Sequence, residues 1–129
     1  MRVTDGCEHD RPASRKTDTF TGAAWQQMML ESEGGAARII SVFFEPGGRT
    51  HWHSHANGQL LMVTAGEGRV ANDDGAHATL RPGDVVWASP GERHWHGAAP
   101  DSTFQHVAAS LGGTEWDGSV DAEEYSRGF

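Results

Sequence analysis

Residues 47–59 read Gly47-Gly48-Arg49-Thr50-His51-Trp52-His53-Ser54-His55-Ala56-Asn57-Gly58-Gln59, and this stretch decides how the chain is interpreted. Residues two apart on a β-strand point to the same face, so His53 and His55 present both imidazoles to one side. The Asn57-Gly58 pair favours a turn, which would bring the amide oxygen of Gln59 beside the two rings. The stretch therefore predicts a chelating set of three side chains.

A second His-x-His pair lies downstream in Pro90-Gly91-Glu92-Arg93-His94-Trp95-His96-Gly97. A single histidine is most often a surface residue or a hydrogen-bonded one. Two such pairs beside glycine turns are hard to explain by packing, because clustered imidazoles must be desolvated or partnered. We expect the second pair to supply the fourth ligand of a metal site.

Around these pairs, short apolar runs alternate with glycine-rich turns such as Pro46-Gly47-Gly48 and Asn72-Asp73-Asp74-Gly75, which is typical of a sandwich or barrel. The fold class expected is all-β, with one short helix over residues 121–127, where Asp121 and Glu124 fit a capping box. The predicted strands cover residues 26–31, 37–45, 51–55, 59–64, 68–71, 77–80, 84–88, 94–97 and 104–111. Residues 1–19 are polar and aperiodic and are expected to form a tail; residues 20–129 should form one domain.

Composition narrows the function classes. The 129 residues carry a net charge of -8, which argues against a nucleic-acid partner and favours a small molecule. The single cysteine, Cys7, can form no internal disulfide, and we expect neither it nor His9 to act in a site. No apolar run is long enough for a signal peptide or a membrane span, so the expected location is the cytoplasm.

The histidine spacing also resembles a known family. The run Gly47, His53, His55, Gln59 and Gly66 resembles the first cupin motif with every spacing kept, and Gln59 replaces the usual glutamate. Gly83, Gly91 and His94 resemble the second motif, although Ser89 and Ala98 stand where its proline and asparagine are expected. The resemblance implies a cupin jelly-roll barrel that binds one metal ion through His53, His55, Gln59 and His94.

From Phe44 to His106 the chain looks more narrowly like the small cupins that include manganese-dependent hydroxynitrile lyases and relatives associated with carboxymuconolactone decarboxylases. That resemblance implies one divalent ion per chain: manganese first, with iron, zinc, nickel, cobalt or copper as alternatives. It leaves His96 and His106 uncoordinated beside the substrate as the catalytic pair, and it makes Ile40, Val42 and Ser110 wall positions of the substrate pocket. It further implies a homodimer or homotetramer. His51 shares a strand face with His53 and His55, so we expect it at the pocket mouth.

Three imidazoles and one amide are all neutral, so they would leave the charge of a divalent ion uncompensated and make it a strong Lewis acid. This favours a lyase acting on a small hydroxylated or carbonyl compound. Two alternatives stay open: a cupin dioxygenase or isomerase acting on an enol or phenol, and a non-catalytic module that binds a small ligand. In each metal-binding case, affinity should fall below a pH of about 6, where free histidine becomes protonated.

Overall fold

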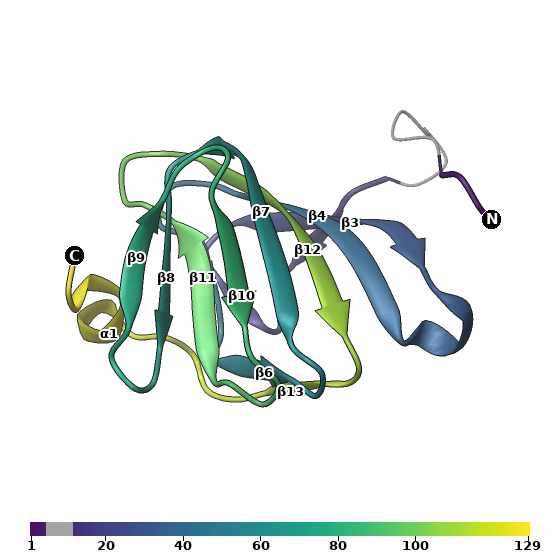
Figure 1. The fold of residues 1–129 in the computed structure, drawn as a ribbon. Helices are drawn as coiled ribbons and strands as arrows, with labels where there is room; N and C mark the ends of the chain where they lie inside the picture. The colour runs from purple at the N-terminus through teal and green to yellow at the C-terminus, as the bar shows by residue number, and fades with distance from the viewer. Residues whose placement is uncertain (5–11) are drawn as a thin grey trace.

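The structure is a computed structural model that describes residues 1–4 and 12–129. Two antiparallel sheets face each other and enclose a barrel, and one short helix packs outside it near the C-terminus (Figure 1). The predicted all-β jelly roll is therefore confirmed. Cys7 and His9 lie outside the described residues.

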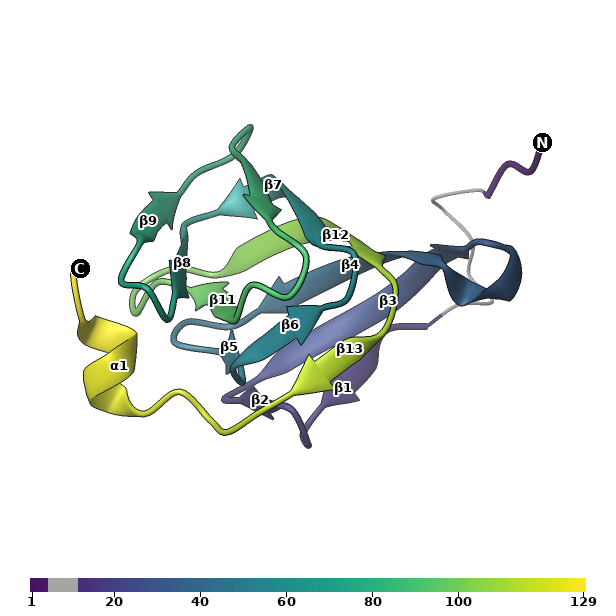
Figure 2. The same ribbon diagram turned by 60° about the horizontal axis from the view of Figure 1, so that its bottom comes forward.

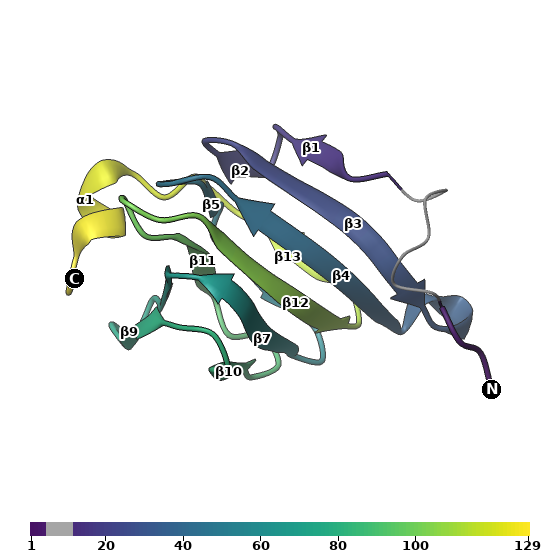
Figure 3. The same ribbon diagram turned by 90° about the horizontal axis from the view of Figure 1, so that it is seen from above.

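The first sheet runs in the order β1-β3-β4-β12-β7-β10. Figure 3 shows these strands side by side from above. Their bounds are β1 (Ser14–Lys16), β3 (Ala24–Glu31), β4 (Ala37–Phe44), β12 (Phe104–Leu111), β7 (Gln59–Gly66) and β10 (Val85–Ala88). A register shift between Gln105 and His106 marks an irregularity where β12 meets β7, and such irregularities add local twist to a sheet.

The second sheet runs in the order β13-β6-β11-β5-β2, and β11 also pairs with β8, which pairs with β9. Figure 2 shows β13 and β6 next to one another at one end of the barrel. The bounds are β2 (Phe20–Thr21), β5 (Arg49–Thr50), β6 (His53–His55), β8 (Gly68–Asn72), β9 (His77–Leu80), β11 (His94–Ala98) and β13 (Thr114–Trp116). A short 3-10 helix, η1 (Glu33–Gly35), connects β3 to β4.

Apolar side chains fill one end of the barrel interior and leave the other end to polar groups. Along β4, Ile40, Val42 and Phe44 alternate inward and are buried, with Phe44 packed against Phe104. A second buried cluster, Trp52, Trp95, Val120 and Tyr125, lies between the second sheet and α1 (Ala122–Ser126). Large aromatic residues at Trp52 and Trp95 thus serve the core, whereas Trp87 is exposed.

The helix begins as predicted. The Asp121 carboxylate accepts a hydrogen bond from the Glu124 backbone N–H, and the Glu124 carboxylate accepts one from the Asp121 N–H, which completes the capping box. The Tyr125 hydroxyl donates to the Ala98 carbonyl at 2.6 Å and ties the helix to β11. Among the described residues, no helix is long and apolar enough to cross a membrane.

Two predictions about the chain's organisation need correction. Residues 14–16, part of the segment expected to be an aperiodic tail, form β1 and pair with β3, because exposed edge positions of β3 offer free backbone groups. The single strand expected over 51–55 is broken: Trp52 lies in a bend, and its N–H donates to the Gly118 carbonyl. His51 consequently lies outside β6.

Alanine substitutions at two glycines test the close backbone packing in the barrel. Both Gly66 and Gly75 have positive φ, but a Cβ at Gly66 would overlap the backbone carbonyl of Thr103, whereas a Cβ at Gly75 meets nothing within 4 Å. Gly75→Ala should cost about 1–2 kcal/mol of unfolding free energy from left-handed strain alone. Gly66→Ala should cost a further amount of about 1–3 kcal/mol from the overlap. Urea unfolding followed by tryptophan fluorescence measures both, and equal losses would contradict the packing described.

Candidate metal centre

The open end of the barrel interior is a cavity of about 260 Å³ between the two sheets. Its lining brings together four histidines from three strands: His53 and His55 of β6, His96 of β11 and His106 of β12. Gln59, at the first residue of β7, lies in the same wall. All five side chains are buried. A cavity of this size suits a small molecule rather than a macromolecule.

Backbone carbonyls fix the orientation of two of the rings. His53 Nδ1 lies 2.9 Å from the His51 carbonyl oxygen, and His94 Nδ1 lies 2.9 Å from the Glu92 carbonyl oxygen. A carbonyl can only accept, so in each ring Nδ1 carries the hydrogen and Nε2 carries a lone pair. This is the arrangement that orients histidine ligands in metal sites.

His94 and Gln59 face each other in a way that suits a bound cation. The Gln59 amide nitrogen donates to Ser110 Oγ at 3.0 Å, which turns the amide oxygen, Oε1, toward His94 Nε2 at 2.9 Å. A neutral imidazole has one N–H, and that of His94 is already used at Nδ1. Two lone pairs therefore meet at this point, and an ion between them would satisfy both.

His55 supplies a further free nitrogen. Its Nδ1 lies 3.0 Å from the Thr114 hydroxyl of β13, which also accepts a hydrogen bond from Arg38 Nη2 at 2.8 Å. Its Nε2 is buried without a partner among the described residues. A buried polar atom without a partner costs free energy unless an ion or water occupies the space beside it. The donor set therefore fits a transition ion, for which imidazole and amide oxygen are suitable ligands.

His96 and His106 form a second unit within the cavity. His106 Nε2 and His96 Nδ1 lie 2.9 Å apart, so one ring donates to the other. The remaining nitrogens, His96 Nε2 and His106 Nδ1, have no partner among the described residues. His106 lies on the buried face of β12, which alternates regularly with its partly exposed face, so the ring points into the cavity. Both rings pack near the Phe44 ring of the core, with ring centroids 6.1 Å away for His96 and 5.6 Å away for His106.

The nitrogens of His53, His94 and His96 lie within 4.8 Å of one another, so these three histidines are positioned to bind a metal ion. The predicted ligands His53 and His94 are in this group. His55 and Gln59 lie beside it, since the rings of His53 and His55 are 5.1 Å apart and Gln59 contacts His94. His96, expected to be uncoordinated, is thus close enough to reach the same position.

Burial lowers the pKa of every histidine in this cluster. Desolvation is the main cause for each: it lowers the pKa of His53 and His96 well below the usual value and lowers that of His94. For His55, desolvation together with neighbouring His94 lowers the pKa to about 4, and for His106 desolvation lowers it to about 3. The rings are neutral at physiological pH, as ligation requires.

The predicted pocket residues divide into two sets. Ile40, Val42 and Ser110 line the cavity. His51 does not, because the bend at Trp52 takes it off the β6 face; it contributes only its carbonyl to His53.

Other lining residues were missed in the sequence. Arg38 shares the inward face of β4 with Ile40 and Val42, so alternation along that strand could have identified it. Thr114 and Trp116 belong to a strand too short to give a period-two signal. Lys16, Asp18 and Thr19 come from the segment taken for a tail.

Comparisons with known proteins agree with this geometry. Residues 40–107 match the family model described as the cupin domain. The chain is 52% identical over 115 residues to a curated protein named (R)-mandelonitrile lyase from Granulicella tundricola, a match that spans 85% of this chain and 88% of that protein.

Solved structures show the same architecture. A cupin-like protein from Thermotoga maritima is 41% identical, covers 97% of this chain and 100% of its own, and superimposes with a TM-score of 0.85. An acetylacetone dioxygenase from Acinetobacter johnsonii shares the fold with a TM-score of 0.75 at 15% identity, over 96% of this chain and 81% of that one. The barrel, the histidine cluster and these matches together show that the chain belongs to the cupin family and is of the hydroxynitrile lyase-like type.

Proposed function

We propose that the chain is a metal-dependent lyase that cleaves a cyanohydrin into a carbonyl compound and hydrogen cyanide. The observation that carries the proposal is the buried His96–His106 pair, which lies in the same cavity as the candidate metal centre. On each ring, one nitrogen has no partner in the part of the chain that the structure describes. The name of the relative that is 52% identical supports the same reaction class.

In this proposal His53, His55, Gln59 and His94 hold one divalent transition ion, manganese by family resemblance. The ion, when bound to these neutral ligands, supplies a Lewis acid that lowers the pKa of a substrate hydroxyl. Ser110 holds the Gln59 amide oxygen toward the site, and the carbonyls of His51 and Glu92 hold the two ring orientations. Ile40 and Val42 form the apolar wall against the rest of the substrate.

In the proposed reaction, His96 and His106 transfer the protons. His106 Nδ1 accepts the proton of the substrate hydroxyl, and the carbon–nitrile bond breaks with its electron pair leaving on cyanide. His96 Nε2 gives a proton to the departing cyanide, and the hydrogen bond between the two rings passes the compensating proton from His106 to His96. The low pKa that burial gives His106 means that its protonated ring releases this proton readily.

Two other activities would use the same cavity. An oxygenase acting on an enol or phenol would consume oxygen, and a binding module would retain ligand affinity when His96 or His106 is removed. Neither is favoured by a particular contact in the cavity. Both are separated from the lyase by the kinetic experiment that follows.

Replacing His106 by alanine should lower kcat/KM for cyanohydrin cleavage by about 100-fold or more while metal content stays unchanged, because His106 acts on a proton and is not among the proposed ligands. Cyanide release from racemic mandelonitrile measures the rate, and elemental analysis measures the metal. His77→Ala, on the exposed strand β9, is the matched control and should keep full activity. Full activity in the His106 variant, or oxygen uptake by wild type, would refute the mechanism.

Metal and protons compete for the same imidazole nitrogens, and burial shifts that competition. The sequence alone placed the loss of metal affinity below a pH of about 6. Burial lowers the pKa of His55 to about 4, so protons compete with the metal at this ring only well below the pH of about 6 expected for free histidine.

The metal-free protein, by contrast, should lose stability as the pH falls from about 6.5, the unfolded-state pKa of histidine. In that range the unfolded chain binds protons that the folded chain does not. The loss should continue down to pH 4 for His55 and pH 3 for His106, at up to about 1.4 kcal/mol per pH unit for each ring. Urea unfolding at pH 7 and at a pH of about 5.5 measures the slope, and His106→Leu should reduce it by one ring's share. Equal stability at the two pH values would contradict neutral burial.

A further inference from the structure

The cavity carries positive charge in a negatively charged protein. Of its described lining residues, three have side chains that are charged at neutral pH: Lys16, Asp18 and Arg38. Lys16 and Asp18 form an ion pair at 3.9 Å and offset one another. Among the described residues, Arg38 has no carboxylate within ion-pair distance, although Glu31 lies opposite it on β3. A divalent ion in the metal centre would add to its positive charge, in a chain of net charge -8. Such a site attracts anions.

Arg38 is held in place at the mouth of the cavity. It lies on β4 opposite Ser110 of β12, on the face that carries the buried Ile40 and Val42, and it is itself half-buried. Its Nη2 donates to Thr114 Oγ1 at 2.8 Å, which bridges the two sheets across the opening. Because this bond fixes the guanidinium, little side-chain freedom remains to be lost when a ligand binds.

Most of the donors of Arg38 are unused. A guanidinium has five N–H groups. Among the described residues, only the bond to Thr114 engages them, and no carboxylate lies within ion-pair distance. A half-buried guanidinium without a counter-ion is costly, and its planar donors match the two oxygens of a carboxylate.

We propose that Arg38 selects substrates that carry a carboxylate at the end remote from the reacting carbon. The inference rests on the proposed lyase function and names its substrate class. Val42, which pairs with His106, is four residues from Arg38 along β4, or about 13 Å between the two backbone positions. Ile40 and Ala108 form the apolar wall between these ends. This separation fits a carboxylated aromatic or short-chain aldehyde and its cyanohydrin.

The test is binding of 4-formylbenzoate compared with 4-formylbenzamide, which has nearly the same shape without the charge. Isothermal titration calorimetry on metal-loaded wild type should show at least about 10-fold tighter binding of the carboxylate, the effect of one charge-assisted bidentate contact. Arg38→Gln should bind the two probes alike. Arg38→Lys, which keeps the charge but not the planar donors, should show an intermediate preference.

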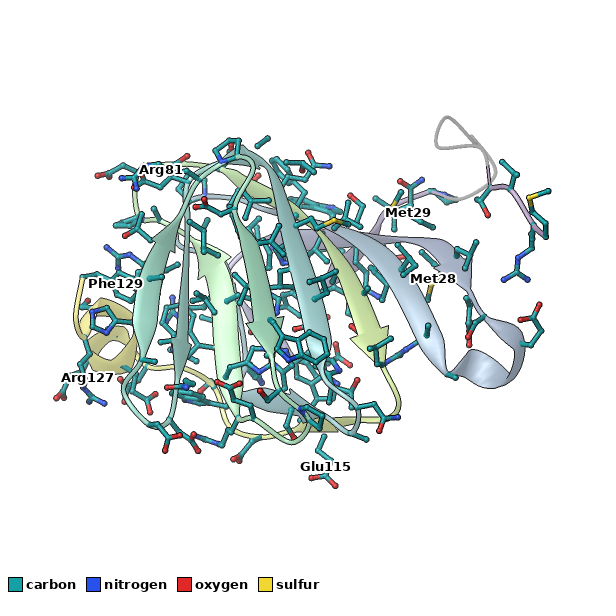
Figure 4. All side chains as sticks on the ribbon, in the orientation of Figure 1. Met28, Met29, Arg81, Glu115, Arg127 and Phe129 are labelled. Atoms are coloured by element: carbon teal, nitrogen blue, oxygen red, sulfur yellow. The ribbon has the colours of Figure 1, made fainter. Side chains whose placement is uncertain are left out.

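The control variant is Arg81→Gln, which removes one positive charge elsewhere. Arg81 is exposed, pairs with Glu67 at 3.5 Å and does not line the cavity. Figure 4 shows it at one end of the barrel, with Glu115, the neighbour of Thr114, at the other. This variant should keep the wild-type preference. Arg38 contacts Thr114, which in turn contacts the proposed ligand His55, so replacing Arg38 could release the ion. Measuring the metal content of each variant shows whether a lost preference for the carboxylate reflects a lost ion.

Three results would overturn the assignment: equal binding of both probes by wild type, a preference that survives in Arg38→Gln, or a preference that Arg81→Gln abolishes as well. A preference that survives in Arg38→Gln but disappears in metal-free protein would show that the carboxylate binds the ion instead. The lyase proposal fails separately. If neither 4-carboxymandelonitrile nor its amide is cleaved but the Arg38-dependent preference persists, the anion site is supported and the lyase assignment is refuted.

Discussion

The burial of five neutral histidines in one barrel is the constraint on which the rest of the structure depends. Each ring has been removed from water, which lowers its pKa, and the lone pairs that result must find a partner. Carbonyls and a hydroxyl satisfy Nδ1 of His53, His94 and His55. Of the opposite nitrogens, His55 Nε2 has no partner among the described residues, and His94 Nε2 faces the Gln59 amide oxygen, so the cluster is a candidate metal centre.

Both sheets supply residues to this centre. The second sheet supplies His53, His55, His94 and His96 from neighbouring strands β6 and β11, whose residues His53 and His94 pair directly. The first sheet supplies Gln59, its partner Ser110, and His106. Arg38 and Thr114 connect the sheets at the opening. The cavity lining combines apolar side chains, Ile40, Val42 and Ala108, with the histidines and Arg38, so a substrate would be oriented by both kinds of contact.

Strand alternation explains how much of this could be predicted from sequence. The pairs at His53/His55 and His94/His96 alternate within strands bounded by glycine turns, so their convergence followed from period-two geometry. The contact between the rings of His96 and His106 could not be predicted from this alternation, because it joins β11 and β12, which lie in opposite sheets. Its 2.9 Å distance depends on the register of both strands. The contributions of Lys16 and Thr114 were missed because β1 and β13 are three-residue strands that exist only through pairing with longer neighbours.

Elemental analysis of untagged protein tests whether the histidine cluster holds a metal ion. Wild type should contain about one transition ion per chain, and the double variant His53→Ala/His55→Ala should contain almost none while keeping its fold by circular dichroism. The identity of the ion would be given by the same measurement. Wild-type protein that folds without any transition ion after growth in metal-supplemented medium, and takes up none on titration, would contradict the account.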